Sequence, residues 1–122
     1  MSKNIPDSIT INDTVYVLAN GAIPAPEVDG MPYVVVRSAT ASPFAGFLES
    51  RESTTVVLVQ ARRIRRWYGA LDLSQLATEG TKAPEKCQFG QPTLRVEIPW
   101  SEIHTCTIMG ASSIQAVPVT KA

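Results

Sequence analysis

The sequence predicts an α+β fold, in which a small, twisted, mainly antiparallel sheet carries one short helix packed on it and an extended N-terminal arm. Three observations support this prediction. Short segments rich in β-branched and apolar residues follow one another between residues 32 and 60, with brief polar turns between them. One later segment begins and ends with helix-capping residues. Prolines and glycines interrupt the start of the chain, so we expect residues 1–31 to be an extension and residues 32–122 a single domain.

Composition limits the class of protein. The chain has 122 residues, 44% of them hydrophobic and 18% charged, and no formal net charge. This length allows one small domain with a core of its own. No apolar run approaches the roughly 20 residues of a membrane-spanning helix, and the first residues lack the apolar stretch of a signal peptide. We therefore expect the protein to act in the cytosol, without a membrane partner.

The N-terminal half is expected to form four strands. Residues 14–18 are rich in β-branched side chains, whereas the proline-containing residues 19–32 are typical of a connector. The next strand spans residues 32–38, and short polar turns separate it from strands at residues 44–50 and 54–60. Connections this short favour an antiparallel meander.

An arginine-rich segment, residues 62–68, is expected to continue the last of these strands. Alternate side chains of a strand share a face. One face would carry Arg63, Arg65 and Trp67, and the other would carry Arg62, Ile64, Arg66 and Tyr68.

A short helix is predicted at residues 73–79. Asp72 precedes it and stands three residues before Gln75, which is the pattern of an N-terminal capping box. Gly80 follows the helix as a C-terminal cap. Leu76 lies in the helix and is an expected core anchor.

The C-terminal part is expected to form two further strands, at residues 93–98 and 101–109, with a break at Pro99 between them. A turn of helix is expected at residues 111–115, and residues 117–119 end the fold.

The sequence offers no convincing catalytic set. Its single histidine, His104, stands two residues before Cys106, so the two side chains would lie on one face of a strand. An ordinary strand histidine beside a core cysteine is the simpler interpretation, and both Cys106 and Cys87 are expected to be free thiols. Phosphate-loop, nucleophile-elbow, zinc-protease and zinc-ligand motifs are absent from the sequence. We therefore expect a binding protein that is not an enzyme, without a metal or a cofactor.

Four of the seven arginines stand at residues 62–66, directly before Trp67 and Tyr68. Guanidinium groups match phosphate oxygens and stack on flat rings, and aromatic side chains stack on bases. This combination indicates a nucleotide site. The alternative is a solvated strand face whose arginine stems cover apolar surface.

A second polar segment, residues 37–42, ends a predicted strand with Arg37 and three hydroxyl side chains. Hydroxyl groups and backbone donors at a turn suit phosphate oxygens. The alternative is a polar turn whose hydroxyls bond to their own backbone.

Several segments resemble a widespread family of small phage proteins. They are residues 37–51, the Ala-Arg-Arg-Ile segment at residues 61–64, Trp67, and the Leu-Ser-Gln-Leu-Ala segment at residues 73–77. Members of this family carry a Phe-Ala-Gly strand, a tryptophan-rich Ala-Arg-Arg strand and a Leu-Ser-Gln-Leu-Ala helix. The resemblance covers residues 33–121.

We associate this family with anti-CBASS sponges, which are oligomeric phage proteins that capture the cyclic dinucleotides made by bacterial immune systems. The resemblance implies that the protein sequesters such a signal without cleaving it, in the cytoplasm of the infected bacterium. Arginines would engage the phosphates, aromatic rings would stack on the bases, and polar side chains would bond the base edges or ribose. The expected ligand-binding residues are Arg37, Ser38, Thr40, Arg62, Arg63, Trp67, Tyr68, Ser74 and Gln75.

The sequence departs from the family pattern at three places. Ala39 stands where members often have tyrosine, Ser42 replaces a glycine, and the Arg65-Arg66 pair replaces an aromatic pair. A lost ring and two added charges affect which nucleotide binds, or whether one binds.

Two other functions stay open on the sequence. Residues 1–31 suit an arm of a virion structural or assembly protein. The same arginines suit an RNA- or single-strand-binding module, although polymer binding usually requires a basic stripe that a chain without net charge lacks. Because a small sheet with exposed edges gains burial by pairing with copies of itself, we also expect a homo-oligomer.

Overall fold

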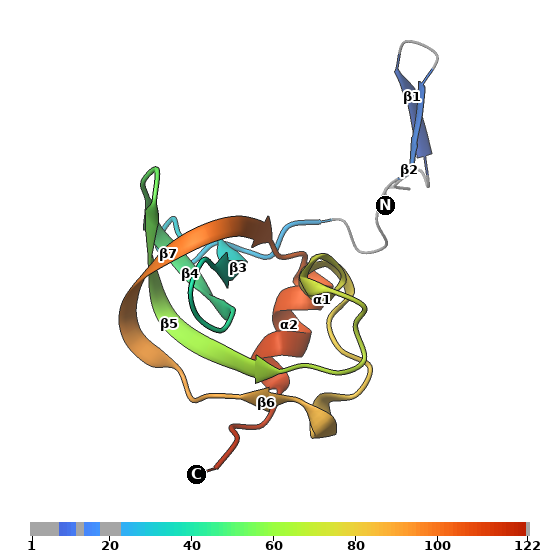
Figure 1. Cartoon of the computed structure of the whole chain (residues 1–122). Coiled ribbons are helices and arrows are strands. Elements are labelled where there is room, and N and C mark those ends of the chain that lie inside the picture. The colour runs from blue at the N-terminus through green and yellow to red at the C-terminus, as the bar shows by residue number, and fades with distance from the viewer. Residues whose placement is uncertain (1–7, 12–13, 18–22, 122) are drawn as a thin grey trace.

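The computed structural model describes residues 8–11, 14–17 and 23–121 (Figure 1). The elements follow in the order β1 (Ser8–Ile11), β2 (Thr14–Val17), β3 (Tyr33–Ser38), β4 (Phe44–Arg51), β5 (Thr55–Arg66), α1 (Leu73–Glu79), a 3-10 turn (Pro84–Lys86), β6 (Gln88–Phe89), β7 (Thr93–Thr105) and α2 (Ile108–Ala116). Residues 1–7, 12–13 and 18–22 of the predicted N-terminal arm therefore lie outside the described residues.

Four strands close into a ring. The sheet order is β4-β3-β7-β5-β6, with β4 also paired to β5, and these pairings are antiparallel. Figure 1 shows β5 and β7 curving around the ring, with both helices toward one end. The predicted α+β class with a mainly antiparallel sheet is confirmed. We expected exposed sheet edges, but these edges are paired in the ring. The homo-oligomer therefore stays a prediction, and exposed edges no longer support it.

The predicted meander is confirmed. β3, β4 and β5 begin and end within two residues of their predicted positions, and β5 does continue into the arginine-rich segment. Short polar turns join the three strands, as their antiparallel pairing requires.

The predicted helix is confirmed as α1. The Asp72 side chain accepts a hydrogen bond from the backbone N–H of Gln75 at 2.9 Å. Gly80 closes the helix at φ 79°, where glycine avoids the strain of a side chain, and its N–H donates to the Leu76 carbonyl at 2.9 Å.

The break predicted at Pro99 is wrong, because β7 runs through it. Residues up to Pro99 pair with β5, and residues from Trp100 onward pair with β3. Pro99 therefore lies where β7 changes partner, and its carbonyl accepts a hydrogen bond from Ala39 at 3.3 Å. A missing N–H is tolerated at this point because no single ladder continues across it.

The turn of helix predicted at residues 111–115 is confirmed, but it belongs to a longer helix, so the fold has two helices where one well-defined helix was predicted. The last strand ends at Thr105, and a second helix, α2, begins at Ile108, inside the predicted strand. Thr107 caps it: the hydroxyl accepts from the Gly110 N–H at 3.0 Å and donates to the Thr78 carbonyl of α1 at 2.6 Å. A capping threonine outweighs the alternating pattern that favoured a strand.

The described end of the predicted extension contacts the rest of the domain. The Ala25 N–H donates to the Cys106 carbonyl at 3.1 Å, and the Ile108 N–H donates to the Ile23 carbonyl at 2.9 Å. Further toward the N-terminus, β1 and β2 pair with each other as a hairpin, and β2 matches the strand predicted at residues 14–18.

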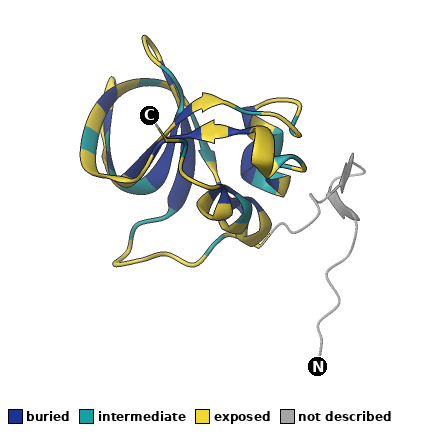
Figure 2. Ribbon diagram, turned by 90° about the horizontal axis from the view of Figure 1, so that it is seen from below, coloured by how far each residue is buried: buried dark blue, intermediate teal, exposed yellow. Residues whose placement is uncertain are grey.

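Two apolar clusters stabilise the domain, and Figure 2 shows continuous buried stretches on the strands, as in β3, where only Arg37 is exposed. One lies within the ring and comes from strands alone, with Val34, Val36, Phe44, Val56, Leu58, Ala61 and Ile98 as members. The other joins the sheet to both helices, and includes Tyr33, Ile64, Leu76, Phe89, Cys106 and Ile114.

Alkaline pH is expected to destabilise the fold. Burial raises the pKa of the Cys106 thiol to about 12, and burial also raises the pKa of the Tyr33 hydroxyl. An unfolded chain loses these protons at the ordinary values of 9.0 and 10.0, whereas the folded chain retains them. Stability should therefore fall as pH rises above about 9, by about 1.4 kcal/mol per pH unit for each proton. Urea unfolding at pH 8 and pH 10.5 measures this slope, and equal stability at both would contradict the burial of these groups.

Candidate functional site

Arg62, which we expected to engage phosphate, is buried and only 4% exposed. Its Nε donates to the Gly90 carbonyl and its Nη1 to the Ile114 carbonyl, both at 2.8 Å. The guanidinium carbon lies 5.5 Å from the centre of the Phe89 ring. Burial lowers the pKa of Arg62, but an arginine stays charged under physiological conditions. Arg62 thus joins β5 to the segment after β6 and to the negative C-terminal end of α2.

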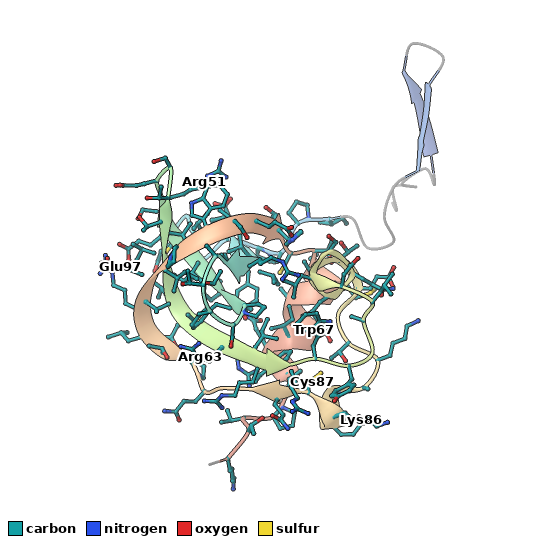
Figure 3. The ribbon with its side chains drawn as sticks, in the orientation of Figure 1. Arg51, Arg63, Trp67, Lys86, Cys87 and Glu97 are labelled. Atoms are coloured by element: carbon teal, nitrogen blue, oxygen red, sulfur yellow. The ribbon has the colours of Figure 1, made fainter. Side chains whose placement is uncertain are left out.

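The other members of the arginine-aromatic segment differ in exposure. Arg63 is exposed, with its guanidinium carbon 4.6 Å from the centre of the Phe44 ring. Trp67 is half-buried against the core, and Tyr68 is 45% exposed. Figure 3 shows Arg63 on β5 and Trp67 beyond the end of that strand. The segment therefore supplies one buried cation, three exposed arginines, of which Arg63 stacks on Phe44, and two rings of unequal accessibility.

The hydroxyls after β3 form the polar turn that the sequence left as an alternative. The Ser38 oxygen accepts hydrogen bonds from the Thr40 N–H at 3.2 Å and the Ala41 N–H at 3.1 Å. Ser38 is buried, whereas Thr40 is exposed. Ser38 thus has a structural partner for its oxygen.

Arg37 and Ser74 are brought toward each other by two residues that the site prediction does not include. The Glu102 carboxylate lies 3.8 Å from the Arg37 guanidinium and 2.9 Å from Nε2 of His104. The other ring nitrogen of His104, Nδ1, lies 3.5 Å from the Ser74 hydroxyl. Gln75 is engaged separately, since its side-chain oxygen accepts from the backbone N–H of Leu71.

This serine–histidine–glutamate chain has the residue types of a hydrolytic relay, but its geometry does not favour catalysis. The Ser74 to His104 distance stands at the outer limit of a hydrogen bond, and the Glu102 side chain is 53% exposed. None of these residues lines the cavities described below. Cys106, the other expected neighbour of His104, lies in the core instead.

One pocket has both polar and apolar walls and a volume of about 390 Å³, and we call it the Tyr33 pocket. Its volume falls within the range typical of small-molecule sites. Aromatic and aliphatic side chains form most of its wall, and Arg62 and two glutamines supply polar groups. The lining residues are Tyr33, Phe47, Gln60, Arg62, Pro92, Gln115, Val117 and Val119.

A bulge in β5 positions the polar wall of this pocket. Phe47 pairs with Val59 and Ala45 pairs with Arg62, so three steps along β5 oppose two along β4. Gln60, inside the bulge, has φ 54°, a left-handed conformation that is uncommon for a residue with a side chain. Bulges and strained residues of this kind recur at functional sites.

A wider, more polar depression of about 670 Å³, the Arg65 groove, adjoins the pocket. The two share Val119, and Gly90, which accepts from Arg62, lines the groove. Among the described residues that line it, those with charge are both cations. The lining residues are Arg65, Gly90, Gln91, Val119, Thr120 and Lys121.

Sequence reasoning missed most of this composite site. Of its lining residues, only Arg62 was among the expected ligand-binding residues. Arg65, where the sequence departs from the family pattern, was a usable signal of the groove, because a charge added at the end of a strand is open to solvent. Gln60 ends an otherwise apolar run, which is a second signal. Gln115, Val119 and Lys121 come from the C-terminal segment and no local pattern identifies them.

The fold and these cavities define a small α+β domain with a closed ring of antiparallel strands and an apolar pocket beside a cationic groove. Residues 31–114 match the family described as a domain of unknown function (DUF6948), and the chain belongs to this family. No curated protein and no solved structure matches the chain. Within residues 8–11, 14–17 and 23–121, no helix is long and apolar enough to cross a membrane, and no group of three or more metal-binding side chains is present.

Proposed function

We propose that this protein binds a cyclic dinucleotide and sequesters it without cleavage, with one base in the Tyr33 pocket and phosphate in the Arg65 groove. The observation that carries the proposal is the shared wall of the two cavities at Val119. An apolar pocket directly beside a cationic depression matches the two halves of a nucleotide.

The pocket supports the placement of a base. Tyr33 and Phe47 meet edge to face, with ring centres 5.0 Å apart, and both line the pocket. Flat apolar walls suit a heterocycle, and the amides of Gln60 and Gln115 offer donors and acceptors for its edge. Part of the apolar surface of a bound base would be removed from water here.

The groove supports the placement of phosphate. Arg65 and Lys121 are exposed cations on its wall, and Thr120 and Gln91 add neutral polar groups. Arg–phosphate contacts are among the stronger hydrogen bonds in proteins. The groove is wide enough to leave the rest of a cyclic ligand at the surface, where a second copy of the chain would be able to cover it.

Replacing single arginines by alanine distinguishes this site from the one predicted on the sequence. Arg65→Ala should weaken cyclic dinucleotide binding by about tenfold, because a lost charge-assisted hydrogen bond amounts to about 1.5 kcal/mol or more. Arg63→Ala is the matched control, since Arg63 is two residues away on the same strand but stacks on Phe44 outside the groove. Isothermal titration calorimetry with cyclic di-GMP measures both.

Equal losses in the two variants would move the site to the arginine-aromatic surface predicted from the sequence. The absence of heat and of any thermal shift across a panel of cyclic dinucleotides would reject the proposed function. Recovery of a cleaved nucleotide after incubation would replace sequestration with catalysis.

A further inference from the structure

One donor of Arg62 is left without a partner. Nε and Nη1 bond backbone carbonyls, but Nη2 is buried with no hydrogen-bond partner among the described residues, where it is the single buried side-chain nitrogen or oxygen in this condition. A buried charged donor without a hydrogen-bond partner lowers the stability of a fold. Arg62 lines the Tyr33 pocket, although Nη2 itself is closed off from solvent, so a ligand in that pocket would supply the missing acceptor after a small movement of the pocket wall.

The strain at Gln60 is an independent observation on the same wall. Gln60 stands two residues before Arg62 in the β5 bulge and lines the same pocket. A glycine would adopt φ 54° without strain, so the retained side chain points to a use for its amide. An amide both donates and accepts, whereas a guanidinium only donates. Selection by base type therefore depends on Arg62.

We infer that the base held in the Tyr33 pocket is a 6-oxopurine, whose O6 accepts from Nη2 of Arg62. This inference rests on the proposed function and adds the identity of the base. Guanine and hypoxanthine present a keto oxygen at this position, whereas adenine presents an amine that is itself a donor. The adenine amine would face Nη2 of Arg62, so two donors would meet beside a buried positive charge, and adenine would bind more weakly.

The test is a calorimetric comparison of cyclic di-GMP, cyclic di-IMP and cyclic di-AMP on the wild-type chain, so it does not depend on the folding of a variant. We expect cyclic di-GMP and cyclic di-IMP to bind within about threefold of each other, and cyclic di-AMP to bind at least about tenfold more weakly. Inosine lacks the exocyclic amine of guanine, so its binding isolates the contribution of O6.

The outcomes distinguish the two proposals. Equal affinity for the adenine and guanine ligands overturns the inference and leaves the proposed function intact. Tight cyclic di-GMP with weak cyclic di-IMP also overturns it, because recognition would then use the exocyclic amine. No binding by any of the three overturns both. As a control, Arg65→Ala should weaken all three by the same factor, because the phosphates are common to them.

Discussion

Replacement of Gly110 by alanine is expected to lower the melting temperature by roughly 10 °C or more. Gly110 lies in α2 where the two helices cross, and a side-chain carbon there would meet the backbone carbonyl of Ala77 in α1. Backbone cannot rotate away as a side chain does, so the helices would have to separate. The direction of the change in stability is informative, because glycine-to-alanine substitution in a helix with free space around it stabilises the helix by about 1 kcal/mol.

The matched control is Ser112→Ala, an exposed position two residues further along the same helix. It should change the melting temperature by no more than about 2 °C, since nothing packs against it as closely. Thermal unfolding followed by circular dichroism reports both variants. A Gly110→Ala protein that melts at or above the wild-type temperature would show that α1 and α2 do not cross in this way.

Arg62→Ala is expected to destabilise the fold by about 2–5 kcal/mol. The change leaves the carbonyls of Gly90 and Ile114 without their donor and opens a cavity in place of the buried stem. Arg63→Ala removes the same atoms from the next residue, which is exposed, and should cost far less. Urea unfolding of the pair measures the difference. Similar losses in both would mean that Arg62 is a surface residue, as a simple basic cluster suggests.

Elements with local signals were predictable from the sequence. The helix α1 was predicted residue by residue, because Asp72, Gln75 and Gly80 encode its caps within a single short segment. Pro99 misled the prediction because its effect depends on which strand pairs with β7 on either side. The start of α2 depends on Thr107 reaching both Gly110 and the Thr78 carbonyl of α1, a contact across the fold.

The candidate site was only partly predictable for the same reason. The arginine cluster stood out at once, and alternation assigned Arg62 and Arg63 to opposite faces. Alternation does not say which face the rest of the chain covers. The partners of Arg62 lie 28 and 52 residues away, so its burial became visible only in three dimensions. The bulge that places Gln60 beside Arg62 likewise results from the pairing of β4 with β5.

Two-dimensional NMR of isotope-labelled protein during titration with cyclic di-GMP tests the proposed ligand site most directly. We expect the largest shifts at the side-chain amides of Gln60 and Gln115, at the Arg62 Nε–H and at the backbone amides of Arg65 and Val119, all from residues of the Tyr33 pocket or the Arg65 groove. Shifts confined to Trp67, Tyr68 and the start of α1, or no shifts at all, would contradict the placement of a nucleotide in these two cavities.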